Sequence, residues 1–329
     1  MSHEHLMALR GAQALDPLPR HDELHLYHVP FDELARGSAV ESVLEDAIRN
    51  SERVVVVGRG GHGKSSLIAH ATRPGQAGIA PIRVPIFAEP DETVSEPKAF
   101  AQHLIRTLTG SATRSGLISP EHREALLRAS SDRVSILGRD MELKRSAAEV
   151  IDAAAEVVTE VANQGLLPVL VLEDTDCWVW PGPDKSALVE AFFGRVIRIF
   201  ADFPGALVVA AHEEYFTLPG FQDAESLLET KVAIPHFNGQ AEQSLARILE
   251  RRIRAAGLDA ELGDVFHKGA LAALGDYYRM ADRNLRKVIL TARLGLRHAC
   301  AHEAETVMRR HLDYAIAEMR KSARHLAHT

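Results

Sequence analysis

A run of four valines followed by a glycine-rich turn constrains this chain more than any other feature. Residues 54–57 are all valine, and the eight residues after them hold four glycines and end in Lys64-Ser65. β-branched side chains pack well on a pleated surface, and an unbroken apolar run is typical of a strand covered on both faces. The sequence therefore predicts a buried parallel strand that turns sharply and leads into a helix.

The turn has the composition of a loop that binds phosphate. Glycine lets the backbone close around an anion, so that N–H groups and the N-terminus of the next helix point at phosphate oxygens. We expect Lys64 to reach the β and γ phosphates of a nucleotide and the Ser65 hydroxyl to complete a Mg²⁺ shell. The alternative is a glycine-rich turn that matches by chance. The predicted nucleotide-binding residues are Gly58, Arg59, Gly60, Gly61, His62, Gly63, Lys64, Ser65 and Ser66.

A second apolar strand is predicted to carry carboxylates. Residues 166–172 are apolar apart from the turn-former Pro168, and Glu173 and Asp174 follow directly. A nucleotide site needs one carboxylate to hold a magnesium-bound water and one to polarise the attacking water. Glu173 and Asp174 are the candidates for these two roles, and an acidic turn that merely ends a strand is the alternative.

A third apolar strand, residues 206–211, ends at His212. This histidine either senses the γ-phosphate or is satisfied locally at the strand end. Short strands are also predicted at 82–87 and 231–235. Helices are expected at 38–49, 65–72, 99–108, 121–129, 141–163 and 186–200, and then at 240–256, 262–274, 284–300 and 303–325. Residues 1–30 are polar and rich in histidine and proline, so an extended arm is predicted there.

Composition narrows the classes of protein that remain. The chain has 329 residues and two cysteines, so a disulfide framework is excluded. No apolar run approaches the roughly 20 residues that span a bilayer, and the start lacks the order of a signal peptide. We therefore expect a cytoplasmic protein with no membrane segment.

Charge is divided unevenly along the chain. Residues 243–329 hold 16 Lys and Arg against 10 Asp and Glu, a net of +6, which leaves 22 against 35, or −13, for residues 1–242. The basic part either offers a surface to DNA or an acidic partner, or is a solvated helical face matched within the chain.

Taken with the two nucleotide motifs and the helical C-terminal part, three segments resemble the AAA+ ATPases, most of all the origin-recognition and replication-initiator clade. The resemblance covers about residues 31–318. Residues 232–238 are similar to that clade's last core strand and its Pro-aromatic-Asn turn, and 245–252 to its first lid helix. Residues 283–290 are similar to the lid helix that carries the second sensor.

The resemblance implies roles for individual residues. Lys64 and Ser65 match the Walker A pair, Glu173 would hold Mg²⁺ together with Ser65, and Asp174 would do the work of the usual catalytic Glu. His212 stands at the first-sensor position, which is usually Asn. Arg286 would be the lid arginine that reaches back over the γ-phosphate.

Three features depart from the clade. The acidic pair has the order Glu-Asp, which bears on the rate of hydrolysis. Residues 224–230 hold no arginine where the family keeps its trans-acting finger. Little sequence follows the lid, which leaves no room for the winged-helix domain of the full initiators.

The predicted fold class is a P-loop NTPase (AAA+) core with a parallel sheet flanked by helices, followed by an α-helical lid. The expected parts are an N-terminal arm (1–30), the α/β core (31–235) and the lid with its tail (236–329), with nucleotide bound in the cleft between core and lid. The expected function is an ATP- and Mg²⁺-dependent switch that assembles with protein partners, or with further copies of itself, in a DNA-linked process such as replication, transposition or mobile-DNA defence. A STAND-type signalling ATPase and a nucleotide-binding scaffold without turnover are the alternatives.

Overall fold

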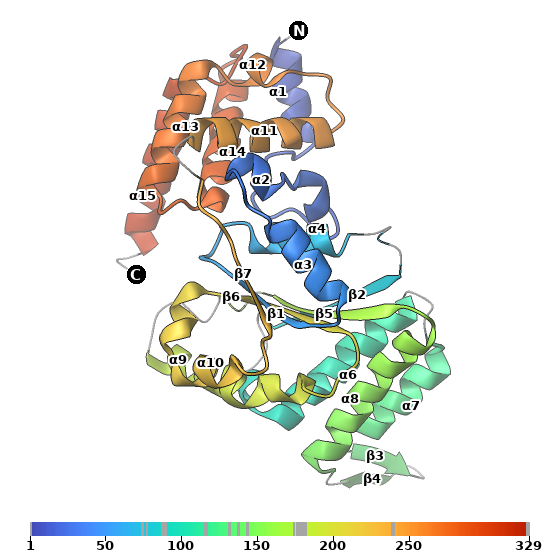
Figure 1. Cartoon of the computed structure of the whole chain (residues 1–329). Coiled ribbons are helices and arrows are strands. Elements are labelled where there is room, and N and C mark those ends of the chain that lie inside the picture. The colour runs from blue at the N-terminus through green and yellow to red at the C-terminus, as the bar shows by residue number, and fades with distance from the viewer. Residues whose placement is uncertain are drawn as a thin grey trace. The chain divides into compact units, whose positions relative to one another are not determined.

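The chain divides into two compact units. In this computed structural model the described residues are 2–73, 76, 78–86, 91–114, 118–130, 133–136, 139–142, 145–173, 175, 183–237 and 241–326. One unit comprises residues 1–41, 59–73 and 234–329, and the other comprises 42–58 and 74–233. We call them the helical unit and the sheet unit, and describe each by itself (Figure 1).

A five-stranded parallel sheet forms the centre of the sheet unit, and it confirms the strands predicted from the sequence. The strand order is β2-β5-β6-β1-β7. All four pairings between neighbouring strands are parallel. The strands are β1 (Arg53–Val57), β2 (Ile79–Pro85), β5 (Leu167–Glu173), β6 (Ala206–Ala211) and β7 (Thr230–Ala233).

The register of the sheet places the candidate polar residues at one edge. Val56 of β1 lies between Ala210 of β6 and Val232 of β7. Leu172 of β5 pairs with Val209 of β6. Because parallel strands share a direction, Glu173 at the end of β5 and His212 just after β6 lie at the same carboxyl edge.

Helices cover the sheet and build an aromatic core. Every residue of β6 is buried, which requires cover on both faces. Phe100, Phe192 and Phe200 pack at ring-centroid distances of 5.6 and 6.0 Å in edge-to-face geometry. In Figure 1 helices α6, α8 and α10 lie on the same side of the sheet. The helices of this part are α3 (Val40–Arg49), α5 (Asp91–Ser95), α6 (Pro97–Arg114), α7 (Pro120–Ser130), α8 (Ala147–Asn163), α9 (Pro183–Ala191), the π-helix η3 (Phe192–Val196), the 3₁₀ helices η4 (Ile197–Phe200) and η5 (Glu213–Thr217), and α10 (Pro219–Ala224).

The helix predicted at 141–163 begins later than expected. An antiparallel pair, β3 (Arg133–Ile136) and β4 (Arg139–Glu142), takes the first residues of that range, and α8 starts at Ala147. Ser146 explains the start, because its hydroxyl accepts from the Glu149 N–H at 3.3 Å while the Glu149 carboxylate accepts from the Ser146 N–H at 2.7 Å. This reciprocal capping box fixes the first turn of α8.

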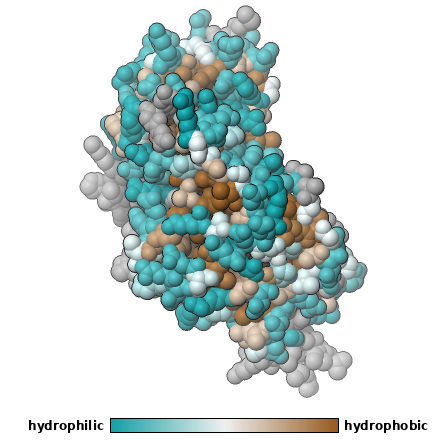
Figure 2. Space-filling view, viewed as in Figure 1, coloured by the Kyte–Doolittle hydropathy of each residue, from teal (hydrophilic) through white to brown (hydrophobic). Residues whose placement is uncertain are grey.

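The helical unit contains the remaining helices. Its visible face is mainly hydrophilic (Figure 2), and none of the described helices of the chain is long and apolar enough to cross a bilayer. The helices are α1 (Ser2–Gly11), η1 (Leu24–Tyr27), α2 (Phe31–Leu34), α4 (Lys64–Ala71), α11 (Ala241–Ala255), α12 (Leu262–Val265), α13 (Lys268–Met280), α14 (Leu285–Ala301) and α15 (Arg309–Leu326).

The N-terminal residues form a helix, which corrects the predicted extended arm. Leu6 and Leu9 of α1 are fully buried in the same core as Leu296 of α14. Farther on, the buried guanidinium of Arg252 donates to the carbonyls of Ala14 at 3.0 Å and Asp16 at 2.8 Å. Burial lowers the pKa of Arg252 to about 10. The prediction relied on the polar composition of residues 1–30, but a few leucines are enough to pack α1 against the core of the helical unit.

Two of the C-terminal helices also differ from their predicted limits. The range 262–274 is split into α12 and α13, and α15 begins at Arg309 instead of residue 303. Both changes come from one backbone bridge, in which the N–H of His267 donates to the carbonyl of Val307 at 3.1 Å and the N–H of Val307 donates to the carbonyl of Val265 at 2.8 Å. Extended backbone at this bridge interrupts both helices.

Two glycines of the sheet unit allow the cost of a strained backbone to be compared with the cost of a steric overlap. Gly165 and Gly205 have φ of +76° and +86°, but only at Gly205 would a Cβ overlap another atom, the carbonyl oxygen of Pro168. We predict that Gly165→Ala costs about 1–2 kcal/mol of unfolding free energy through the left-handed backbone, and that Gly205→Ala costs clearly more. Denaturant unfolding of both variants measures this, and equal losses would contradict the overlap at Gly205.

Candidate nucleotide-binding site

The predicted phosphate loop has the backbone of an anion cradle. Gly61 and Gly63 adopt φ of +77° and +105°, in the left-handed region that favours glycine. Gly63 is also the N-cap of α4 and contributes no side-chain cap. The first N–H groups of an α-helix have no acceptor within the helix, and an anion can bind there. Lys64 is buried in the helical unit, and its ammonium group donates to the Arg59 carbonyl at 3.2 Å.

The residues that lead into α14 hold the loop in place. The side-chain amide of Asn284 donates to the Gly60 carbonyl at 2.8 Å, and the Leu285 N–H donates to the Gly61 carbonyl at 3.0 Å. Nε2 of His62 lies 3.2 Å from the carbonyl of Asp282 and donates to it. A Cβ at Gly61 would overlap the Asn284 side chain. Three loop residues thus bond to one short segment, which fixes the loop against the start of α14.

Asn284 has a second role in the same place. Its Oδ1 accepts from the Lys287 N–H at 3.0 Å, which caps α14. Its two polar atoms therefore serve the helix and the loop at once. The sequence analysis did not single out this residue, although an Asn directly before an apolar helix is a recognised start signal.

A buried histidine anchors α4 from its other side. His28 stacks on His70 at 4.4 Å between centroids, and its Nδ1 lies 3.1 Å from the Ser66 hydroxyl. Its Nε2 lies 3.1 Å from a carboxylate oxygen of Glu41, which also accepts from the Phe31 N–H at 2.6 Å. Burial opposes ionisation of Glu41, but the hydrogen bonds from His28 and Phe31 outweigh it and lower the pKa of this carboxyl. Ser66, a predicted site residue, is thereby tied to the N-terminal segment.

In the sheet unit, Glu173 is buried at the end of β5 and forms an ion pair with Arg83 of β2. Thr175 is held beside it, because its hydroxyl donates to the Ala210 carbonyl at 2.5 Å and its carbonyl accepts from the Tyr215 hydroxyl. The carboxylate of Glu173 thus faces a cation that was not among the predicted site residues. Asp174 lies outside the described residues.

His212 has a local partner. Its Nδ1 accepts from the Glu214 N–H at 3.3 Å, so the ring caps the short helix η5. The ring also lies 6.0 Å from that of Tyr215. This local arrangement is the alternative to a sensing role that the sequence left open.

Arg286 lies in the first turn of α14 and is exposed. The apolar face predicted for this helix is present, since Val288, Ile289 and Ala292 are buried. Arg286 follows directly on the two residues that bond to the phosphate loop. The side chain of Arg286 therefore lies within one helical turn of the residues that bond to the loop.

The donors in the helical unit fit the phosphates of a nucleotide. A polyphosphate is bound by helix N-termini, ammonium groups and hydroxyl groups. Here these are the N-terminus of α4, which has no side-chain cap, the ammonium group of Lys64 and the hydroxyl of Ser65. Ser65 and Glu173 carry oxygen atoms of the type that Mg²⁺ prefers. The ion pair with Arg83 uses one carboxylate oxygen of Glu173.

Solved structures resemble this chain over most of its length. The Aeropyrum pernix ORC1 protein in complex with DNA matches with a TM-score of 0.53 and 18% identity, over 92% of this chain and 71% of that one. The ADP form of A. pernix ORC2 gives 0.54 and 16%, over 89% and 72%. Drosophila ORC bound to DNA gives 0.50 and 17%, over 98% and 68%.

This chain has the AAA+ fold of origin-recognition proteins. The strand order and the helices on both sides of the sheet confirm the predicted fold class. No protein-family model and no curated protein sequence matches the chain.

The two roles of Asn284 can be separated by substitution. Asn284→Asp keeps an acceptor for the Lys287 N–H but removes the donor to Gly60, whereas Asn284→Ala removes both. We predict that Asp leaves the stability of α14 nearly unchanged and speeds hydrogen exchange of the Leu285 amide, because the loop is released. Asn284→Ala should speed that exchange and also cost about 1 kcal/mol through the lost cap.

Hydrogen exchange read by NMR or mass spectrometry, together with thermal unfolding, checks both variants. Unchanged exchange at Leu285 in Asn284→Asp would show that the bond to Gly60 does not hold the loop.

Proposed function

We propose that this protein binds ATP with Mg²⁺ and hydrolyses it to drive a conformational switch. The observation that carries the proposal is the glycine-capped N-terminus of α4 with the buried ammonium group of Lys64 at its first residue. Anions bind at such termini because the unpaired N–H groups and the helix dipole both favour negative charge. The loop residues 58–66 are assigned to the phosphates.

Residues at the carboxyl edge of the sheet are proposed to take part in metal binding and hydrolysis. Bound Mg²⁺ would neutralise phosphate charge, and Ser65 and Glu173 are the residues proposed to hold it, Glu173 partly through water. Asp174 is proposed to orient and deprotonate the attacking water. His212 is proposed to report on the γ-phosphate through Nε2, since its Nδ1 already accepts from Glu214.

The contacts of the loop support a switch. Gly60, Gly61 and His62 bond directly to residues 282–285, so a loop that adjusts to phosphate also adjusts the start of α14. Arg286 is the next residue, and its side chain is exposed. We propose that it responds to the γ-phosphate, which ATP has and ADP lacks, so that the two nucleotides stabilise different states of the helical unit.

The surroundings of this activity are proposed to be protein partners and DNA. Two of the similar structures, those of A. pernix ORC1 and Drosophila ORC, contain DNA. The net charge of +6 over residues 243–329 agrees with a partner of negative charge. Assembly with other proteins, or with further copies of the chain, belongs to the same proposal.

A nucleotide-binding scaffold without turnover is the second candidate. The ion pair between Glu173 and Arg83 favours it, because a carboxylate already neutralised by a guanidinium attracts a metal ion less strongly. Binding is expected in both candidates, and only hydrolysis separates them.

The first test is Lys64→Ala. This change removes the one ammonium group of the loop and should weaken ATP binding by about a hundredfold or more, since charge-assisted bonds to phosphate are lost. Calorimetric titration measures it. Lys268→Ala, at an exposed lysine of α13, is the matched control and should bind like the parent. Equal ATP affinity in Lys64→Ala and the control would refute the site.

The second test concerns turnover. Asp174→Asn should retain ATP and slow hydrolysis by about a hundredfold, because the amide cannot accept the proton of the attacking water. Phosphate release under multiple turnover measures the rate. Turnover that is absent already in the parent would favour the scaffold, and parental turnover in Asp174→Asn would move the base to another residue.

A further inference from the structure

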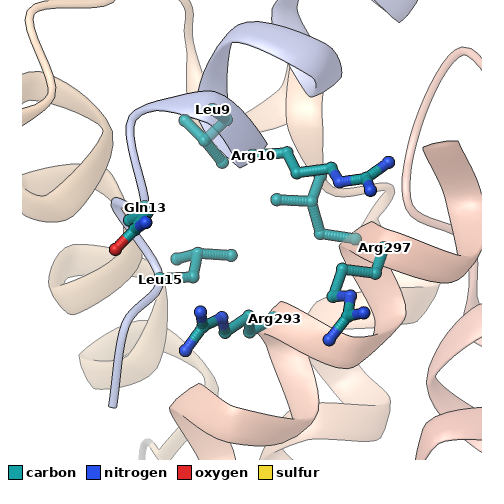
Figure 3. A pocket seen from close by; sticks show the side chains of 7 residues that line it. Leu9, Arg10, Gln13, Leu15, Arg293 and Arg297 are labelled. Carbon is teal, nitrogen blue, oxygen red and sulfur yellow. The ribbon is translucent and has the colours of Figure 1, made fainter. Parts of the chain in front are cut away.

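A pocket of the helical unit lies between α1 and α14. Its volume is about 210 Å³. Figure 3 shows arginine side chains from the two helices around a hollow whose near wall is the turn that follows α1. The residues that line it are Leu9, Arg10, Gln13, Leu15, Arg293, Leu296 and Arg297.

The pocket concentrates positive charge. Arg293 and Arg297 are four residues apart on α14, so they share one face of the helix and repel each other. Arg10 adds a third guanidinium from α1. Asp16 pairs with Arg293 at 3.2 Å, and within the described residues neither Arg10 nor Arg297 forms an ion pair. Three arginines and one aspartate leave a net charge of +2.

The walls of the pocket are fixed. Leu9, Leu15 and Leu296 are buried and contribute apolar side chains to the lining of the pocket. The turn that carries Leu15 is held on both sides, because the buried Arg252 donates to the carbonyls of Ala14 and Asp16. Positive charges placed on a rigid frame favour a bound anion, since little has to be reordered when it binds.

We propose that this pocket binds a phosphomonoester dianion carried by a small molecule. The dianion matches the net charge of +2, and guanidinium groups bind phosphate oxygens through paired N–H donors. The phosphate of a monoester carries two negative charges and is linked to the rest of the molecule at one oxygen. The phosphate of a diester carries one negative charge and is linked at two oxygens, so more of the ligand would have to leave the pocket. The volume is below the range of about 300–1,000 Å³ that encloses a whole ligand, so it suits a head group.

This site is separate from the phosphate loop. Its arginines lie two and three turns along α14 from Leu285, the residue that bonds to the loop. None of its lining residues belongs to the loop or to the segment 282–285.

The test uses the full chain with Lys64→Ala, so that binding of the probe at the phosphate loop is weakened. Methyl phosphate, dimethyl phosphate and acetate are titrated calorimetrically at constant ionic strength. We expect methyl phosphate to bind at least about tenfold more tightly than the other two probes. No detectable methyl phosphate binding overturns the proposal. Equal affinity for dimethyl phosphate would indicate a nucleic-acid backbone, equal affinity for acetate an acidic peptide, and each overturns it too.

Variants locate the binding. Arg10→Gln with Arg297→Gln should lower methyl phosphate affinity at least about tenfold. Arg251→Gln, at an exposed arginine of α11, is the matched control and should bind like the parent. Parental affinity in the double variant places the phosphate elsewhere and overturns the proposal. Since the comparison is between variants of the same chain, it holds whether or not the phosphate loop binds the probe.

Arg297→Lys is a second variant for the case in which the double variant fails to fold. It keeps the charge but lacks the planar pair of donors, so methyl phosphate affinity should fall while that for acetate changes little. Unchanged methyl phosphate affinity in this variant contradicts recognition by the guanidinium of Arg297.

Discussion

Two hydrogen bonds to loop carbonyls, from Asn284 to Gly60 and from Leu285 to Gly61, are the contacts on which the rest of the helical unit's site depends. They are possible only because Gly61 has a positive φ and no Cβ, which lets Asn284 approach the backbone. With His28 on the Ser66 side, they fix α4 and its N-terminus between elements distant in sequence. The same bonds join the start of α14 directly to the loop.

The strands and the glycine-rich turn before α4 were predictable because their signals are local. A run of β-branched residues favours a buried strand wherever it stands, and four glycines before Lys-Ser favour a sharp turn into a helix. The antiparallel strands β3 and β4 carry no such signal, since five of their eight residues are polar. Helix α1 was not predicted because Leu6 and Leu9 are buried only by packing against the core to which α14 contributes, and this packing is not visible in the local sequence.

The partners of the candidate residues depend on tertiary register, which one sequence does not reveal. Arg83 reaches Glu173 because Pro85 is the register partner of Glu173 and side chains two residues apart share a face of the sheet. The bond of His28 to Glu41 and the cap that His212 gives to η5 are equally invisible in composition. The sequence thus indicated which residues carry charge at the site, and the fold determines what each one contacts.

The most direct measurement of the central claim is the calorimetric affinity of the parent chain for ATP, ADP and AMP, each with Mg²⁺. The donors of the loop are proposed to act on the β and γ phosphates, so ATP and ADP should bind tightly and AMP at least about a hundredfold more weakly. Affinity for AMP equal to that for ATP would show that the phosphates beyond the first make no contact with the loop. That result would contradict the assignment of residues 58–66 as a nucleotide site.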